Sequence, residues 1–226
     1  MFSFSDIRFG ADLKMNAEIE TLKTGTTTVG IKTKDGVILA SERRATMGHI
    51  IAHSHVQKVF SISDNIGMTI AGLVGDAQLM VRFLQSEVAV YSMKRGAPMT
   101  VNAAATLVAN VIRQGFYLGL IVGGYDAKGG HIYSIDGAGG CIEDNYVSVG
   151  SGSLFALGVL EGKYQEGMTE DEGVDLAISA LNSAIRRDSA SGDGMLISII
   201  NKKGTKEIPE ETIRARAAEL GFRYPN

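Results

Sequence analysis

The dipeptide Asp35-Gly36 constrains the fold of this chain more than any other local feature, because it separates two runs rich in β-branched and aliphatic residues. Asp-Gly between such runs favours the tight turn of a β-hairpin. Ser63-Asp64-Asn65 separates a second pair of runs in the same way. The N-terminal third of the chain therefore predicts strands that are paired antiparallel by short turns.

Further along the chain, helices are predicted in pairs between additional strands. Asp76 and Thr100 are placed to cap two helices, and Thr169 to Glu172 has the pattern of a capping box. Pro209 opens a last helix that ends before Gly221. The predicted strands are 27–33, 37–42, 58–62, 66–71, 118–123, 131–135, 147–150 and 195–201, and the predicted helices are 76–94, 101–112, 154–164, 169–187 and one after 209.

Hairpin-linked strands and paired helices favour an α+β architecture over alternating βαβ units. One helical pair on each side of two stacked antiparallel sheets would form a four-layer αββα sandwich. We therefore predict this architecture for one large domain, which a chain of 226 residues with 45% hydrophobic residues can build. Residues 1–25 show no useful periodicity and read as a polar leader.

Composition excludes several classes of protein. The 22 basic and 25 acidic side chains give a net charge of −3, whereas a nucleic-acid binder would present a basic face. No apolar run approaches the roughly 18–20 residues that cross a bilayer, and the leader lacks the pattern of a secretory signal. A single cysteine, Cys141, excludes an internal disulfide and fits a reducing cytoplasm.

Three candidate sites have simpler interpretations. His49, His53 and His55 have no acidic or thiol partner between them, so we expect an exposed polar connection rather than a metal site. The glycines at 71–76 lack the spacing of a phosphate-binding loop, and Cys141 lacks the context of a nucleophile. We therefore expect no metal and no cofactor.

The most informative segment is Gly25-Thr26-Thr27-Thr28. Three threonines are good strand formers and need no further explanation. Alternatively, cleavage after Gly25 would expose Thr26 with a hydroxyl nucleophile and an α-amine of pKa about 7.7–8.0. Such an amine can serve as the general base for its own hydroxyl, so that no histidine is required.

Downstream blocks give weight to the second interpretation. TTTVGIKTKDGVILASERR, then Lys58, GMTIAGLVGDAQ, GSGS and RRDSASGDG follow one another along the chain. In this order they resemble the β subunits of the proteasome core particle, the archaeal ones above all, over residues 26–220. The resemblance implies the N-terminal-nucleophile hydrolase fold and threonine protease activity on unfolded proteins. It also implies stacked seven-membered rings of β subunits, capped by α subunits through which a regulatory ATPase acts.

The resemblance also implies roles for individual residues. Thr26 matches the nucleophile, and Gly25 matches the residue before the autocatalytic cut, so that 1–25 would be a propeptide and 26–226 the catalytic domain. Lys58 matches a catalytic lysine, whose charge would keep the neighbouring amine neutral. Glu42 matches an acid, more often Asp in the family, that would orient Lys58. Its extra methylene is a departure that bears on the geometry around Lys58.

Other matched positions surround this centre. Ser151, Asp188 and Ser191 match the group that orients the N-terminal amine and relays protons. Gly72 matches the residue whose backbone N–H stabilises the oxyanion, and with Thr46 it would pair the substrate as an added strand. The positions that match the primary specificity pocket are Ala45, Val56, Ile70 and Val74, with Gln78 nearby.

Two rival functions remain open at this point. A non-catalytic ring subunit would generally lack the threonine, the lysine or the processing glycine, all of which are present as Thr26, Lys58 and Gly25. An amidase acting on small molecules would favour Cys or Ser at the new N-terminus. A second departure, at 113–118, is a stretch shorter than its counterpart in some relatives, which leaves the turn there undefined.

Overall fold

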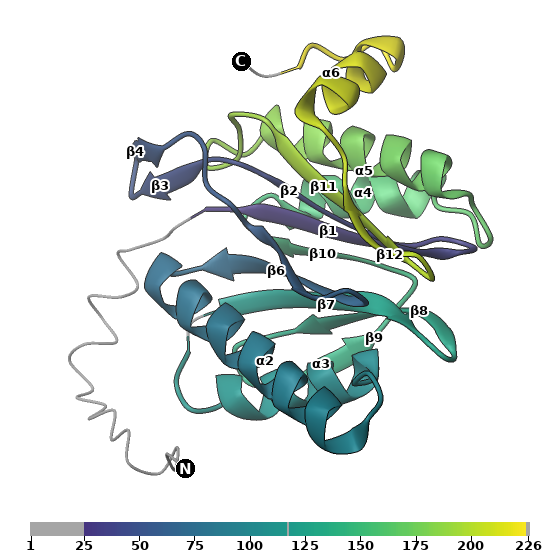
Figure 1. Ribbon diagram of the computed structural model, residues 1–226. Helices are drawn as coiled ribbons and strands as arrows, with labels where there is room; N and C mark the ends of the chain where they lie inside the picture. Colours follow the sequence, from purple (N-terminus) through teal and green to yellow (C-terminus); the bar gives the residue numbers. More distant parts are fainter. Residues whose placement is uncertain (1–24, 117, 225–226) are drawn as a thin grey trace.

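Two five-stranded antiparallel sheets lie face to face in the computed structural model, which describes residues 25–116 and 118–224 (Figure 1). The first sheet has the order β10-β1-β2-β11-β12 and the second has the order β5-β6-β7-β8-β9. The strands of the first sheet are β10 (Tyr146–Gly150), β1 (Thr27–Lys32), β2 (Gly36–Glu42), β11 (Met195–Asn201) and β12 (Gly204–Glu207). Those of the second are β5 (Val59–Ser63), β6 (Ile66–Gly72), β7 (Leu118–Asp126), β8 (Gly129–Ile135) and β9 (Cys141–Glu143).

Helices cover the outer face of each sheet (Figure 1). The pair α2 (Val74–Arg95) and α3 (Val101–Ile112) packs on the second sheet, and the pair α4 (Ser153–Lys163) and α5 (Glu170–Ile185) packs on the first. A last helix, α6 (Glu210–Glu219), contacts α5 and β11. The predicted four-layer αββα sandwich is therefore confirmed.

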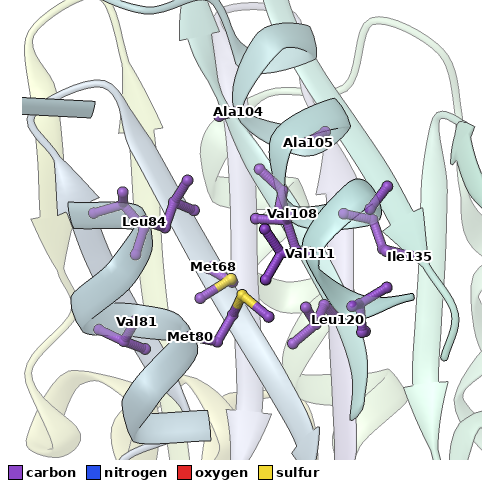
Figure 2. Packing of buried hydrophobic residues seen from close by; sticks show 14 of the residues in the cluster. Met68, Met80, Val81, Leu84, Ala104, Ala105, Val108, Val111, Leu120 and Ile135 are labelled. Carbon is purple, nitrogen blue, oxygen red and sulfur yellow. The ribbon is translucent and has the colours of Figure 1, made fainter. Parts of the chain in front are cut away.

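Three apolar layers hold the sandwich together. Figure 2 shows the layer beneath α2 and α3, where Met80 and Leu84 meet Met68 of β6 and Val108 lies above Leu120 of β7. A central layer joins the inner faces of the sheets, and a third lies beneath α4 and α5. Because β1 and β2 are covered on both faces, they are buried almost throughout and do not show the alternation of a half-exposed strand.

Most predicted element boundaries lie within one to three residues of those observed. Thr100 caps α3, and Thr169 with Glu172 forms the predicted capping box of α5. The predicted cap at Asp76 is wrong, because α2 begins at Val74 after Leu73. Asp76 lies instead in the first turn, where its carboxylate faces the positive end of the helix dipole. Pro209 is the N-cap of α6 and not part of its first turn.

The sequence analysis missed four short strands, namely β9, β12, and the hairpin of β3 (Ala45–Met47) and β4 (Ile50–His53). The hairpin turns at Gly48, whose φ of 61° suits glycine. Its strands have only three and four residues and are largely exposed, so they carry no clear apolar pattern. The predicted polar connection thus contains a two-stranded sheet, with His49, His53 and His55 exposed as expected.

The predicted leader, residues 1–25, lies outside the described residues except for Gly25. In 25–116 and 118–224, none of the helices combines the length and apolar character needed to cross a membrane.

Candidate active site

The site forms at one end of the first sheet, where antiparallel neighbours bring distant parts of the chain together. Thr26 directly precedes β1, Thr27 pairs with Gly150 at the end of β10, and Glu42 at the end of β2 pairs with Met195 at the start of β11. In an antiparallel sheet the end of one strand lies beside the start of its neighbour. The topology therefore places these residues at a common edge.

The Thr26 hydroxyl lies beside the carbonyl group that precedes it in the chain. Its Oγ1 donates to the Gly25 carbonyl oxygen at 2.7 Å and accepts from Lys58 Nζ at 3.0 Å. Thr26 is only 4% exposed, so this contact takes place largely away from water. The Thr26 hydroxyl thus lies between the Lys58 amine and the carbonyl group of the bond that we expect to be cut.

Lys58 and Glu42 form a buried ion pair beside Thr26. Lys58 Nζ also donates to the Arg44 carbonyl oxygen. The Glu42 carboxylate accepts from the backbone N–H groups of Thr27 at 3.2 Å, Arg44 at 2.7 Å and Gly192 at 3.0 Å. This many donors compensate a charge that would otherwise be costly to bury.

Burial and pairing act in opposite directions on the two titrating groups. Burial raises the pKa of the Glu42 carboxyl above its ordinary value, and the facing Lys58 ammonium opposes this shift. Burial lowers the pKa of the Lys58 amine, and the Glu42 carboxylate opposes that shift. Lys58 is therefore an amine whose proton is held less firmly than that of a solvated lysine.

A second group of polar side chains approaches Thr26 from the other side. Ser151 Oγ accepts a hydrogen bond from the Thr26 backbone N–H at 3.1 Å and donates one to Asp188 Oδ2 at 2.6 Å. Ser191 Oγ donates to the same Asp188 oxygen at 2.7 Å and lies 2.7 Å from Thr27 Oγ1. The structure thus brings together Ser151, Asp188 and Ser191 around the nitrogen that cleavage would convert into an amine.

A cavity of about 250 Å³ opens beside Thr26. Thr46 Oγ1, on its wall, accepts from the Gly25 backbone N–H at 3.1 Å. All the positions that we expected to bind substrate line this cavity, namely Ala45, Thr46, Val56, Ile70, Gly72 and Val74, with Gln78. Ala45 and Ile70 are buried, whereas Val74 is 46% exposed at the rim.

Two glycines permit the close packing around Thr26. A Cβ atom at Gly25 would overlap the Ala190 side chain, and one at Gly150 would overlap the Thr26 carbonyl oxygen. Gly150 also has a φ of 114°, which residues with a side chain rarely adopt. Space thus requires glycine at both positions, and backbone conformation requires it at Gly150 as well.

Three residues of the site were missed by the sequence analysis. Thr27 contacts Ser191, and Arg44 pairs with Asp193 across the site. Thr27 and Arg44 lie in the TTTVGIKTKDGVILASERR block, and Asp193 lies in RRDSASGDG. The sequence thus places all three residues in informative blocks but does not indicate that Arg44 and Asp193 form a pair. A pair separated by 149 residues leaves no signal in local patterning.

Among the described residues, no three His, Cys, Asp or Glu side chains gather as a possible metal-ligand group. Cys141 is a free, half-buried thiol on β9, and burial raises its pKa, which disfavours the nucleophilic thiolate.

Comparison with known proteins shows the family of this chain. A family model described as proteasome subunit matches residues 22–200. Relatives named proteasome subunit beta include one from Methanocorpusculum labreanum, 50% identical over 204 residues, which are 88% of this chain and 96% of the relative. Another, from Thermoplasma acidophilum, is 49% identical over 208 residues, 90% of this chain and 98% of the relative.

The chain therefore belongs to the proteasome subunit family, as a β subunit of the archaeal type. Its αββα sandwich is the fold of the N-terminal-nucleophile hydrolases, in agreement with the prediction from sequence. As a subunit it assembles with other subunits into the proteasome complex.

Proposed function

We propose that this chain is the proteolytic β subunit of a proteasome core particle, a threonine-type endopeptidase with Thr26 as its nucleophile. The observation that carries the proposal is the position of the Thr26 hydroxyl, 3.0 Å from Lys58 Nζ and 2.7 Å from the Gly25 carbonyl oxygen. A peptidase role also agrees with relatives named proteasome subunit beta. A non-catalytic ring subunit is not favoured, because such a subunit has no need of this arrangement.

Self-cleavage would create the nucleophile from the precursor. Thr26 Oγ1 attacks the Gly25 carbonyl carbon, the bond from that carbon to the Thr26 nitrogen breaks, and the nitrogen gains the hydroxyl proton. Water then hydrolyses the resulting ester. The products are the Gly25 carboxylate and a free Thr26 with its hydroxyl and α-amine, which leaves 1–25 as a propeptide and 26–226 as the catalytic domain.

In the mature subunit the new amine would act as the general base for the Thr26 hydroxyl. The nearby Lys58 ammonium disfavours a second positive charge and so keeps the amine neutral, while Glu42 orients Lys58. Ser151, which contacts the Thr26 nitrogen at 3.1 Å, and the adjoining Asp188 would orient the amine and relay its proton.

The substrate would enter the cavity beside Thr26 as an added strand. The N–H of Gly25 already donates to Thr46 Oγ1, and the residue before the scissile bond of a substrate would take the place of Gly25. Gly72, whose backbone lines the same cavity, is the proposed oxyanion donor. The leader has glycine before its scissile bond, whereas a substrate residue with a side chain at this position must shift away from Ala190 to avoid overlap.

We further propose that the partners are proteasome α subunits and other β subunits in stacked seven-membered rings. An ATPase acting through the α ring would deliver unfolded protein substrates, and we place the assembly in the cytoplasm. Mass spectrometry and peptide hydrolysis of the particle assembled with α subunits test the proposal. A particle that retains residues 1–25 and hydrolyses no peptide would refute it.

Gly25→Ala is expected to slow self-cleavage by about tenfold or more, because the added Cβ meets Ala190 and displaces the carbonyl from the Thr26 hydroxyl. The processed fraction is followed by mass spectrometry during assembly. Gly158→Ala is a matched control, because Gly158 on α4 has no positive φ, as is the case for Gly25, but has nothing near its Cβ position. Equal processing rates for Gly25→Ala and the unaltered chain would contradict the steric argument.

Cleavage is expected mainly after large apolar residues such as Leu, Tyr or Phe. Ala45, Val56, Ile70 and Val74 present uncharged side chains to the cavity. Lys58 also lines the cavity, but its charge is already paired with Glu42. A charged substrate side chain would therefore lose hydration without gaining an unpaired opposite charge, whereas an apolar one gains about 1.5–3 kcal/mol on full burial. Fluorogenic peptides ending in Leu or Tyr, Arg, and Glu test the ranking on the assembled particle, and faster turnover of the Arg or Glu peptide would contradict it.

Ala45→Asp should shift this ranking towards Arg, because it adds a carboxylate to the cavity wall. Ala127→Asp adds the same charge at an exposed turn far along the sheet and is expected to leave the ranking unchanged. If neither variant changes the ranking, Ala45 does not line the specificity pocket.

A further inference from the structure

Arg44 and Asp193 form a bidentate ion pair at the site. Arg44 Nε donates to Asp193 Oδ2 at 2.7 Å and Nη2 donates to Oδ1 at 3.0 Å. The third guanidinium nitrogen, Nη1, donates to the Ser189 carbonyl oxygen at 2.9 Å. Two parallel hydrogen bonds fix the relative orientation of the two side chains as well as their distance.

The backbone of Arg44 is at the same time part of the buried Lys58–Glu42 arrangement. Its N–H donates to Glu42 Oε2 at 2.7 Å, and its carbonyl oxygen accepts from Lys58 Nζ. The side chain of Arg44 therefore reaches one half of the site, while its backbone positions the other half.

Asp193 belongs to the turn between α5 and β11 that carries the other polar group. Ser191 and Asp188 lie in this turn, and the N–H of Gly192 donates to Glu42 Oε2 at 3.0 Å. A Cβ at Gly192 would overlap the Arg44 guanidinium, so the turn and the side chain fit closely. The geometry of this turn thus depends on where Arg44 lies.

The backbone at Asp193 is itself unusual. Its φ is 62°, and among the described residues it is the sole non-glycine with a positive φ. Such a conformation is strained for a residue with a side chain and persists where its surroundings hold it. The two hydrogen bonds from Arg44 supply that restraint.

We propose that the Arg44–Asp193 pair is a positioning clamp that keeps Lys58 and Glu42 in register with Asp188 and Ser191 on opposite sides of Thr26. This inference deepens the proposed function and depends on it. The pair does not touch the Thr26 hydroxyl; it acts through Lys58, which does, and through the polar side chains hydrogen-bonded around Thr26. Its loss should misplace the catalytic groups and lower kcat, while the cavity that binds substrate, and hence KM, is unchanged.

The side chains of Arg44 and Asp193 are only 21% and 14% exposed. A bidentate pair that is this well covered can contribute to the free energy of unfolding as well as to positioning, so the two effects must be measured separately. A loss of turnover without a comparable loss of thermal stability is therefore the signature that separates a clamp from a structural contact.

Asp193→Asn and Arg44→Lys test the clamp in the fully assembled particle. Asparagine tolerates the left-handed backbone but cannot accept two charge-assisted hydrogen bonds, and lysine keeps the charge but lacks the planar fork. For each variant, kcat on a fluorogenic Leu or Tyr peptide is expected to fall by about 10–100-fold with KM within about twofold, since misplacement of catalytic groups has effects on this scale. The double variant should lose no more than either single variant, because each alone opens the clamp.

Glu210→Gln is the matched control, since it removes the exposed partner of the neighbouring Arg43 and is expected to change neither parameter. An unchanged kcat, or a raised KM at constant kcat, in both Asp193→Asn and Arg44→Lys would overturn the clamp. Failure of both to assemble would identify a structural pair and overturn it too. If the unaltered particle is itself unprocessed and inactive, the proposed function fails. This outcome is distinguishable from failure of the clamp alone, in which the unaltered particle is active and the variants keep its kcat or do not assemble.

Discussion

Thr26→Ala is expected to leave residues 1–25 attached and to abolish peptide hydrolysis. Alanine has no hydroxyl to attack the Gly25 carbonyl carbon, so neither the precursor nor a substrate can form the ester intermediate. Loss of a catalytic nucleophile can lower kcat by roughly 10⁶-fold, which here means activity at background. Mass spectrometry and N-terminal sequencing of the particle assembled in vitro with α subunits measure the first effect, and fluorogenic peptides measure the second.

Thr26→Ser is the matched control, because serine keeps a hydroxyl and an amine on the same skeleton. It is expected to process and to retain measurable turnover. If the Thr26→Ala subunit, assembled only with α subunits, still began at residue 26, another agent would make the cut and self-processing would be wrong.

Lys58→Ala is expected to abolish both self-cleavage and peptide hydrolysis, with kcat lowered by about 10²–10⁴-fold or more in any processed fraction. This range is typical of the loss of a positioned proton-transfer or activating group. The physical reason is the 3.0 Å contact between Lys58 Nζ and Thr26 Oγ1, through which the lysine acts directly on the nucleophilic hydroxyl. Lys58→Arg should not restore activity, because a guanidinium is larger and differently shaped.

Folding must be separated from chemistry in this experiment. Lys58→Ala leaves the Glu42 carboxylate buried and unpaired, which typically destabilises by about 3–5 kcal/mol. The double variant Lys58→Ala/Glu42→Gln removes both charges but keeps a side-chain oxygen that can accept from the surrounding backbone N–H groups, and it is expected to recover much of the thermal stability while remaining inactive. A correctly assembled Lys58→Ala particle with near-native turnover would rule out the role of this lysine.

Local patterning in the sequence was sufficient for most of the architecture. The hairpin at Asp35-Gly36 and the caps at Thr100 and Thr169 lie where they were predicted, since turn and capping preferences depend on neighbouring residues. The short β3–β4 hairpin was missed because it is exposed and brief. The cap at Asp76 was wrong because α2 begins one turn earlier than its acidic residue suggests.

The candidate site divides in the same way. The sequence by itself determined that Gly25, Thr26, Glu42 and Lys58 are candidates. It did so through the Gly-Thr segment, in which cleavage would expose a hydroxyl nucleophile and an amine, and through the resemblance to a family. Only the tertiary structure decided their distances and burial, and it alone revealed that Arg44 and Asp193 are partners. The reason is physical: turns and caps arise from contacts between near neighbours, whereas the site arises where sheet pairing brings the β1–β2 hairpin beside β10 and β11, which are remote from it in the chain.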